Sequence, residues 1–320
     1  MNQLFADMHC DTITTLYDRI QGGSSGTLRK NDIQIDFEKL QKSRYLLQNF
    51  AVFFDKDVWK ENLFEEAMRR IDFFEKQLAQ NTDLIRQIIT YDEIVQSEKE
   101  NRISALLTLE GGESLEGNVD NLMRFHEKGV RMITLTWNYD NELGHCHFDT
   151  EGKGLTKLGF EVVERMEELH MIPDVSHGSD ALFFDVCKVA KKPFVASHSN
   201  ARGVYNRTRN MSDEMIRALA EHGGVMGMNY FAGFTSARAR EDGMCYLEDI
   251  LKHMRHVVNV GGIECLGLGS DFDGIPTEVE WQHAGNMDFV LEGMKKAGFS
   301  SAECDKICRE NVLRLYKECL

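Results

Sequence analysis

The sequence predicts an α/β fold in which eight parallel strands close into a (β/α)8 barrel of the TIM type. Short runs rich in apolar, β-branched or aromatic residues recur eight times along the 320 residues, and amphipathic helical patterns separate most of them. Several runs are apolar on both faces, which is typical of strands covered on both sides in a parallel sheet. A doubly wound open sheet is the alternative, and the number of strands favours the barrel.

The expected strands cover residues 4–8, 46–54, 103–109, 132–135, 172–175, 194–196, 225–228 and 265–268. Between the fourth and the fifth, one helix face is marked by Leu158, Val162, Val163, Met166 and Leu169. Ser179 and Ser212 are expected N-caps of later helices, and Ser300 with Glu303 forms a capping box for the last one. Because no repeat, low-complexity tract or linker interrupts the pattern, residues 1–320 are expected to form a single domain.

The composition is that of an ordinary globular protein, with 42% hydrophobic and 28% charged residues. There are 37 Lys and Arg against 52 Asp and Glu, and the net charge of −15 disfavours binding to nucleic acid or to an anionic membrane surface. The eight cysteines include no Cys-x-x-Cys pair, which indicates reduced thiols. Without a signal-peptide or anchor pattern, the chain is expected in the cytoplasm, and a homodimer is one alternative for its oligomeric state.

Side chains that can hold a metal or move a proton follow five of the expected strands. They are His9 and Asp11 after the first strand, Glu110 after the third, His177 after the fifth, His198 after the sixth and Asp271 after the eighth. Each residue alone has a plain structural explanation. In a (β/α)8 barrel, however, the carboxyl ends of the strands meet at one mouth, where active sites lie. The six side chains are therefore expected to converge.

Three carboxylates and three histidines suit a two-metal hydrolytic centre, in which cations about 3.5–4 Å apart share a hydroxide. Glu110 is the candidate bridging ligand, because a carboxylate has two oxygens and the following Gly111 and Gly112 allow close backbone approach. Imidazole and carboxylate ligands without thiolate indicate zinc, although manganese, cobalt and iron fit as well. Cys10 lies between two ligand positions and is expected to point to the opposite face of the strand.

Short motifs are spread along the chain in a fixed order. They are Asp7-x-His9-x-Asp11, Glu110-Gly-Gly-x-Ser114-Leu115, Gly154-Leu-Thr-x-x-Gly159, Asp174-x-Ser176-His177, Ser197-His198-Ser199, Arg209-Asn210, Gly269-Ser-Asp271-Phe-Asp273-Gly274 and Asn311-Val-Leu-Arg314. In this order and spacing they resemble the renal or membrane dipeptidases, binuclear zinc peptidases of the amidohydrolase superfamily. The resemblance extends over nearly the whole chain, which is most similar to the shorter bacterial members because it lacks the features of the secreted, lipid-anchored and disulfide-linked animal ones.

The resemblance implies two zinc ions per chain. His9 and Asp11 would hold one ion, His177 and His198 would hold the other, and Glu110 would bridge them.

The resemblance also implies roles for residues near the metals. Asp271 would be the general acid/base, which takes a proton from the bridging hydroxide and passes it to the leaving amine. Asp273 would face elsewhere, although the sequence leaves the reverse assignment open. Arg209 matches the family arginine that binds the terminal carboxylate of the substrate.

Trp137 departs from the family pattern, because the family has a substrate-contacting histidine at this strand end. An indole can donate a hydrogen bond but cannot accept a proton. Either Trp137 or the neighbouring Asn138 is expected to replace the histidine as a donor to the scissile carbonyl, and a packing role for Trp137 is the alternative. The His-Cys-His segment at 145–147 is expected to be a surface loop and not a third metal site.

The expected function is hydrolysis of the peptide bond of dipeptides through a hydroxide that bridges two zinc ions. An amidohydrolase that acts on N-acyl amino acids with the same metal centre is the alternative. A non-catalytic metal-binding protein is a remote alternative, and a free carboxylate at Asp271 beside the metals opposes it. The expected partner is thus a small dipeptide substrate, and neither nucleic acid nor membrane is expected to bind.

Overall fold

The computed structural model, which describes residues 3–55 and 58–320, contains one closed barrel of eight parallel strands. Each strand pairs with the next along the chain, β2 pairs directly with β4, and β10 pairs with β1 to close the barrel. The barrel strands are β1 (Phe5–Asp7), β2 (Tyr45–Phe53), β4 (Ile103–Glu110), β5 (Val130–Thr134), β6 (Ile172–Asp174), β7 (Val195–Ser199), β8 (Val225–Met228) and β10 (Leu266–Leu268). Each overlaps an expected strand, so the predicted (β/α)8 barrel is confirmed.

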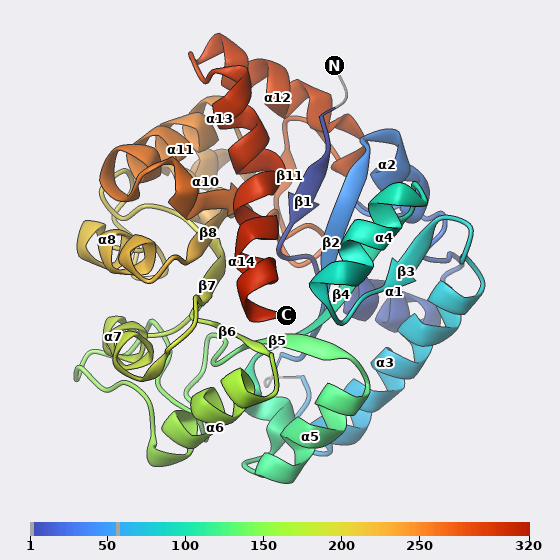
Figure 1. Cartoon of the computed structure of the whole chain (residues 1–320), viewed down its shortest axis with the longest axis vertical. Coiled ribbons are helices and arrows are strands. Elements are labelled where there is room, and N and C mark those ends of the chain that lie inside the picture. Colours follow the sequence, from blue (N-terminus) through green and yellow to red (C-terminus); the bar gives the residue numbers. More distant parts are fainter. Residues whose placement is uncertain (1–2, 56–57) are drawn as a thin grey trace.

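Helices surround the barrel on its outer face (Figure 1). The α-helices are α1 (Thr12–Gln21), α2 (Phe37–Lys42), α3 (Leu63–Ala79), α4 (Tyr91–Lys99), α5 (Val119–Glu127), α6 (Lys157–Glu168), α7 (Asp180–Val189), α8 (Asp213–Glu221), α9 (Ala232–Thr235), α10 (Ala237–Asp242), α11 (Leu247–Gly261), α12 (Met287–Lys296), α13 (Ser301–Asp305) and α14 (Asn311–Cys319). The expected N-caps are present, because the side chains of Ser179, Ser212 and Ser300 accept hydrogen bonds from helix backbone N–H groups. Among the described residues, no helix combines the length and apolarity needed to cross a bilayer.

The remaining elements are short, and the sequence did not indicate them. They are β3 (Ile85–Gln87), β9 (Met244–Cys245), β11 (Glu278–Val279), the 3-10 turns η1 (Gly112–Leu115), η2 (Ile263–Cys265) and η3 (Ala284–Asn286), and the π-helical turn η4 (Lys306–Glu310). Strand β3 pairs with the first half of β4, and β5 pairs with the second half, from Leu107 onward, along the same edge of β4. Three residues with one fully buried side chain carry too little pattern for a strand to be predicted.

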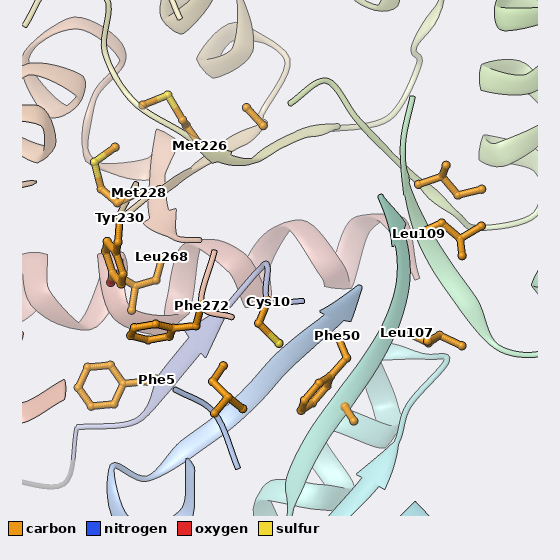
Figure 2. Packing of buried hydrophobic residues seen from close by; sticks show 14 of the residues in the cluster. Phe5, Cys10, Phe50, Leu107, Leu109, Met226, Met228, Tyr230, Leu268 and Phe272 are labelled. Carbon is orange, nitrogen blue, oxygen red and sulfur yellow. The ribbon is translucent and has the colours of Figure 1, made fainter. Parts of the chain in front are cut away.

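Strand β4 shows how the barrel aims side chains at the site. Leu107 and Leu109 lie in the large apolar cluster between the strands and the helices (Figure 2), whereas Leu106 belongs to the cluster inside the barrel. Because successive side chains of a strand point to opposite faces, Glu110 is directed inward at the carboxyl end of β4. Cys10 also lies in the outer cluster (Figure 2), away from the interior.

Helix α14 crosses one end of the barrel (Figure 1). Its apolar face packs against the interior cluster that contains Met8, Leu47 and Met132, and the Tyr316 hydroxyl lies 2.6 Å from Asn49 Nδ2. The turn η4 precedes this helix and contacts β1 and β10. With this end filled by side chains, the opposite end, where the strands finish, is left for the site.

Candidate metal centre

The structure brings together the six side chains that the sequence places at strand ends. They are His9 and Asp11 just after β1, Glu110 as the last residue of β4, His177 after β6, His198 within β7 and Asp271 after β10. All are buried, with at most 7% of each residue exposed. The nearest side-chain atoms of neighbouring members lie within 4 Å of one another.

Glu110 lies at the centre of this group, and its two oxygens face different partners. Oε1 is 3.0 Å from His177 Nε2 and 3.2 Å from His198 Nε2. Oε2 is 3.4 Å from His9 Nε2. The carboxylate thus lies between the imidazoles of His177 and His198 on one side and the imidazole of His9 on the other.

His9 also lies next to two further carboxylates, those of Asp11 and Asp271. Its Nε2 is 3.3 Å from Asp11 Oδ2 and 3.7 Å from Asp271 Oδ1. Its ring stacks on that of His198, with centroids 3.8 Å apart. His9 belongs to two groups of potential metal ligands. One group is His9, Glu110 and His198, and the other is His9, Asp11 and Asp271; within each group the potential ligand atoms all lie within 4.8 Å of one another.

The ionisable groups of the site perturb one another. Burial, reinforced by the negative charge of Asp11, raises the pKa of Glu110 to about 8, and burial raises the pKa of Asp271 to about 7. Burial lowers the pKa of His177 and of His198 well below the usual range of a histidine. Carboxylates crowded together in a dry site are groups that a bound cation would stabilise.

The donor set fits divalent metal ions. Imidazole nitrogens and carboxylate oxygens without thiolate suit zinc. The Oδ1 atom of Asp11 is buried and has no hydrogen-bond partner among the described residues, so an acceptor is available for a cation. Gly274 leaves room beside it, because a Cβ there would lie 1.9 Å from Asp11 Oδ2 and 2.8 Å from Asp271 Oδ1.

A hydrogen-bond chain behind His198 fixes its ring. Asp174 Oδ2 accepts hydrogen bonds from the hydroxyls of Thr134 and Ser197, at 2.6 and 2.5 Å. Since a carboxylate only accepts, the Ser197 proton is committed, and Ser197 Oγ accepts from His198 Nδ1 at 2.8 Å. The lone pair of His198 Nε2 is thereby left for a metal, which is how outer partners orient metal-binding histidines.

Asp271 and Asp273 face different surroundings, although both have left-handed backbone conformations with φ of 61° and 68°. Asp271 lines the cavity at the barrel mouth and accepts a hydrogen bond from Asn229 Nδ2 at 2.9 Å. Asp273 instead accepts from the Thr12 hydroxyl and from the backbone N–H of Gln34, both at 2.6 Å. The structure thus places Asp271, and not Asp273, beside the metal-binding groups.

The mouth of the barrel holds a cavity of about 150 Å³ next to these groups. Its lining residues are Asp11, Phe53, Glu110, Trp137, Asn138, His177, Phe231, Phe234, Asp271, Gly274, Ile275 and Pro276. Trp137 packs against Phe53 and Tyr139, with ring centroids 4.6 and 5.4 Å apart, and forms part of the apolar wall. Both residues singled out at the end of the fourth predicted strand, Trp137 and Asn138, therefore border the cavity.

Arg209 is buried beside the group and is not part of the cavity lining. Nη1 donates to Ser199 Oγ and Nη2 donates to the His198 carbonyl, each at 2.8 Å. Nε is buried without a hydrogen-bond partner among the described residues, so the guanidinium retains unused donors. Burial lowers its pKa to about 10, which still leaves it charged at neutral pH.

Comparison with known proteins decides the family. The model of the membrane dipeptidase family, peptidase family M19, matches residues 2–319. The chain belongs to this family. It is accordingly a metallopeptidase of the dipeptidase type, a hydrolase.

Individual relatives of this M19 dipeptidase share the sequence at a moderate level. An uncharacterized protein in the pqqA 5′ region of Klebsiella pneumoniae is 29% identical over 256 residues, which cover 78% of this chain and 94% of that protein. An uncharacterized dipeptidase of Schizosaccharomyces pombe is 26% identical over 289 residues, which cover 88% of this chain and 67% of the yeast protein.

Two solved structures share the fold. A metallopeptidase of family M19 called dipeptidase AC superposes with a TM-score of 0.91 at 23% identity, over 100% of this chain and 99% of that one. A metallopeptidase from Rhodobacter sphaeroides, solved with a phosphinate mimic of the dipeptide L-Ala-D-Ala, superposes with a TM-score of 0.89 at 22% identity, over 99% of both chains. These likenesses bear out the barrel.

The sequence did not reveal the residues that support the candidate ligands. Ser197 and Asp174 fall inside motifs that the sequence displays, but only the folded chain shows that they form the chain behind His198. Asn229 directly follows β8, and this position at a strand end is the signal by which the sequence could have indicated it as a site residue. The 145–147 segment is not simply a surface loop, because Cys146 and His147 are buried.

Replacement of Ser197 by alanine tests the chain behind His198. Outer partners of metal-binding histidines typically contribute 10- to 100-fold to metal affinity, so Ser197→Ala should weaken zinc binding by about that factor. Zinc affinity is measured by competition with a chromophoric chelator. Ser212→Ala is the matched control, because it removes the N-cap of α8, costs about 1 kcal/mol of stability and should leave zinc affinity unchanged. Equal zinc affinities in the two variants would contradict the orienting role.

Proposed function

We propose that residues 1–320 form a single hydrolase domain that binds two zinc ions per chain and cleaves the peptide bond of dipeptides. One observation carries the proposal: Glu110 directs one oxygen to His177 and His198 and the other to His9. We assign His9 and Asp11 to one ion, His177 and His198 to the other, and Glu110 to both. When bound, the two ions supply a hydroxide nucleophile at neutral pH and polarise the scissile carbonyl.

Asp271 is the residue that we assign to proton transfer. Its Oδ1 lies 3.7 Å from His9 Nε2 and its side chain borders the cavity, so it can reach both the attacking water and the leaving amine. Asn229 Nδ2 donates to the other oxygen, Oδ2, and so restricts the orientation of the carboxylate at the edge of the cavity. The contacts of Asp273 with Thr12 and with the backbone of Gln34 support leaving it out of this role.

The cavity accommodates a small substrate with an apolar side chain. Aromatic rings of Phe53, Trp137 and Phe234 contribute to its walls, and Asn138 adds an amide. We assign Arg209, whose positive charge interacts with those of the cavity-lining Asp271 and Glu110, to the free carboxylate of the dipeptide, and Asn138 or the Trp137 indole N–H to the scissile carbonyl. The dipeptide mimic bound by the Rhodobacter sphaeroides metallopeptidase supports this substrate class.

A reducing compartment, the cytoplasm, suits this enzyme. The eight cysteines lie in the described part of the chain and are all free thiols, seven of them buried. Thiols of this kind persist in a reducing environment.

Metal-dependent dipeptide hydrolysis is the direct test of the function. Protein prepared with excess zinc should contain close to two ions per chain by elemental analysis, hydrolyse free dipeptides, lose activity on chelation and regain it when zinc returns. A parallel panel of N-acyl amino acids serves as the comparison. Full activity with a single ion per chain, or a preference for N-acyl amino acids over every dipeptide, would overturn the proposal.

Replacement of Asp271 by asparagine tests proton transfer. The change keeps the shape and the contact with Asn229 but removes the titratable oxygen, so kcat should fall by roughly 10²–10⁴. Zinc content, measured on the same preparation, should stay at the wild-type value. Asp273→Asn is the matched control for turnover. It should retain far more activity, because the Asp273 side chain contacts Thr12 and the backbone of Gln34 and takes no part in proton transfer. A wild-type kcat in Asp271→Asn would remove this residue from the mechanism.

Dipeptide amides test the role of Arg209. A hydrogen bond to a charged group contributes about 1.5–3 kcal/mol, so Arg209→Ala should lower kcat/KM on free dipeptides by roughly 10- to 150-fold. Amides lack the carboxylate, so they should be poor substrates of the wild type and nearly insensitive to the mutation. Zinc content must be checked, since Arg209 also contacts the His198 carbonyl. Equal hydrolysis of amides and free acids by the wild type would refute the assignment.

A further inference from the structure

The side chain of Asn138 joins two histidines at the barrel mouth. Its Oδ1 lies 2.8 Å from His177 Nδ1 and 3.1 Å from His147 Nε2. The other ring nitrogen of His147, Nδ1, lies 2.9 Å from Thr208 Oγ1. A continuous hydrogen-bonded path therefore runs from Thr208, in the segment between β7 and α8, to a candidate metal ligand.

The direction of these bonds follows from the amide. An amide oxygen only accepts, so His177 Nδ1 and His147 Nε2 both donate to Asn138. His177 then carries its proton on Nδ1, and the lone pair of Nε2 faces Glu110. With the amide reversed, the proton of a neutral His177 would sit on Nε2, which lies 3.0 Å from both Glu110 Oε1 and His198 Nε2, and that nitrogen could not bind a metal.

The same bonds determine what the amide nitrogen can do. Within the described part of the chain, Asn138 Nδ2 makes no hydrogen bond, and Asn138 borders the cavity. With Oδ1 held by two imidazoles, the N–H2 group remains for a ligand in the cavity. One histidine of the pair is a candidate metal ligand, whereas the other, His147, has no role in the site as described so far.

His147 reaches this place from the long segment between β5 and α6. Its backbone N–H donates to the His177 carbonyl at 2.7 Å, and Cys146 forms a bridge with Gly178. Only 8% of His147 is exposed. The backbone is thus already anchored to the His177 turn, and the imidazole makes further contacts that anchoring alone does not require.

We propose that His147 is a positioning residue for the metal centre. Through Asn138 it fixes the tautomer and the orientation of His177, and this role requires only that the site binds zinc. It also holds the Asn138 N–H2 group in place for the scissile carbonyl, a role that rests on the proposed dipeptidase function. A hydrogen bond to the outer nitrogen of a metal-binding imidazole raises its basicity and restricts its ring, so it affects zinc affinity even without turnover.

Two substitutions of His147 separate hydrogen bonding from packing. His147→Phe keeps a ring beside Phe148 but cannot donate, so zinc affinity of the full chain should fall roughly tenfold, the lower end of the effect of such partners. His147→Gln keeps an N–H at a similar reach and should stay within about twofold of the wild type. His145→Phe is the matched control on the same segment, because the His145 side chain pairs with Asp140 and not with the site. Zinc affinity is measured by chelator competition.

The outcomes decide the proposal. Wild-type zinc affinity in His147→Phe, or equal losses in His147→Phe and His147→Gln, would overturn it. If His147→Phe does not fold, the tautomer of His177 in the wild type provides the test. Long-range proton–nitrogen NMR spectra should show the proton of His177 on Nδ1. A proton on Nε2 would overturn the proposal.

A substitution of Asn138 separates this proposal from the proposed function. Asn138→Asp keeps the acceptor but loses the N–H2 group, so it should retain zinc affinity and lose about 10²–10³ in kcat. Loss of zinc affinity in Asn138→Asp would contradict the acceptor role. Tight zinc binding by a wild type that cleaves no dipeptide would refute the proposed function and leave the role of His147 toward zinc intact.

Discussion

The burial of the Glu110 carboxylate between histidines on both of its sides is the constraint on which the site depends. An unpaired carboxylate in an apolar interior is strongly disfavoured, so this group must be met by donors or by cations. Here, three imidazole nitrogens lie within 3.4 Å of its two oxygens. Burial, reinforced by the negative charge of Asp11, raises the pKa of Glu110 and of Asp271. Divalent cations would resolve the same crowding without protons.

The barrel supplies this arrangement through simple rules. Parallel strands finish at one end, and alternation along β4 sends Glu110 inward while Leu107 and Leu109 pack outward. Two of the three histidines, His198 and His177, are held from behind, His198 by Ser197 and His177 by Asn138. The two outer partners differ in chemistry, a hydroxyl in one case and an amide in the other, yet both accept the Nδ1 proton. Both rings therefore present Nε2 to the centre.

The sequence predicted the barrel and the convergence of the six side chains because both depend on local patterns, strand by strand. The short strand β3 and the interruption of the last helix by η4 were missed, since three to five residues carry little periodicity. The sequence favoured Asp271 over Asp273 but left the reverse assignment open, because only the folded chain shows that Asp271 borders the cavity whereas Asp273 contacts Thr12 and Gln34. His147 was assigned to a surface loop because its burial depends on a backbone contact with His177, thirty residues along the chain. The assignments of metal ligands, Arg209 and Trp137 to chemical roles stay predictions.

Closure of the barrel has a consequence for how the protein folds. Strand β1 completes its hydrogen bonds only with β10, and α14 fills the end of the barrel against residues of β1, β2 and β5. The first and last elements of the described chain thus depend on each other, and the contacts between them have the greatest possible separation in sequence. Such contacts form slowly, since the entropy of closing a long loop must be overcome first. In a partly synthesised chain that lacks residues 266–319, the apolar residues that α14 covers would stay exposed, and exposed apolar surface of this kind favours aggregation.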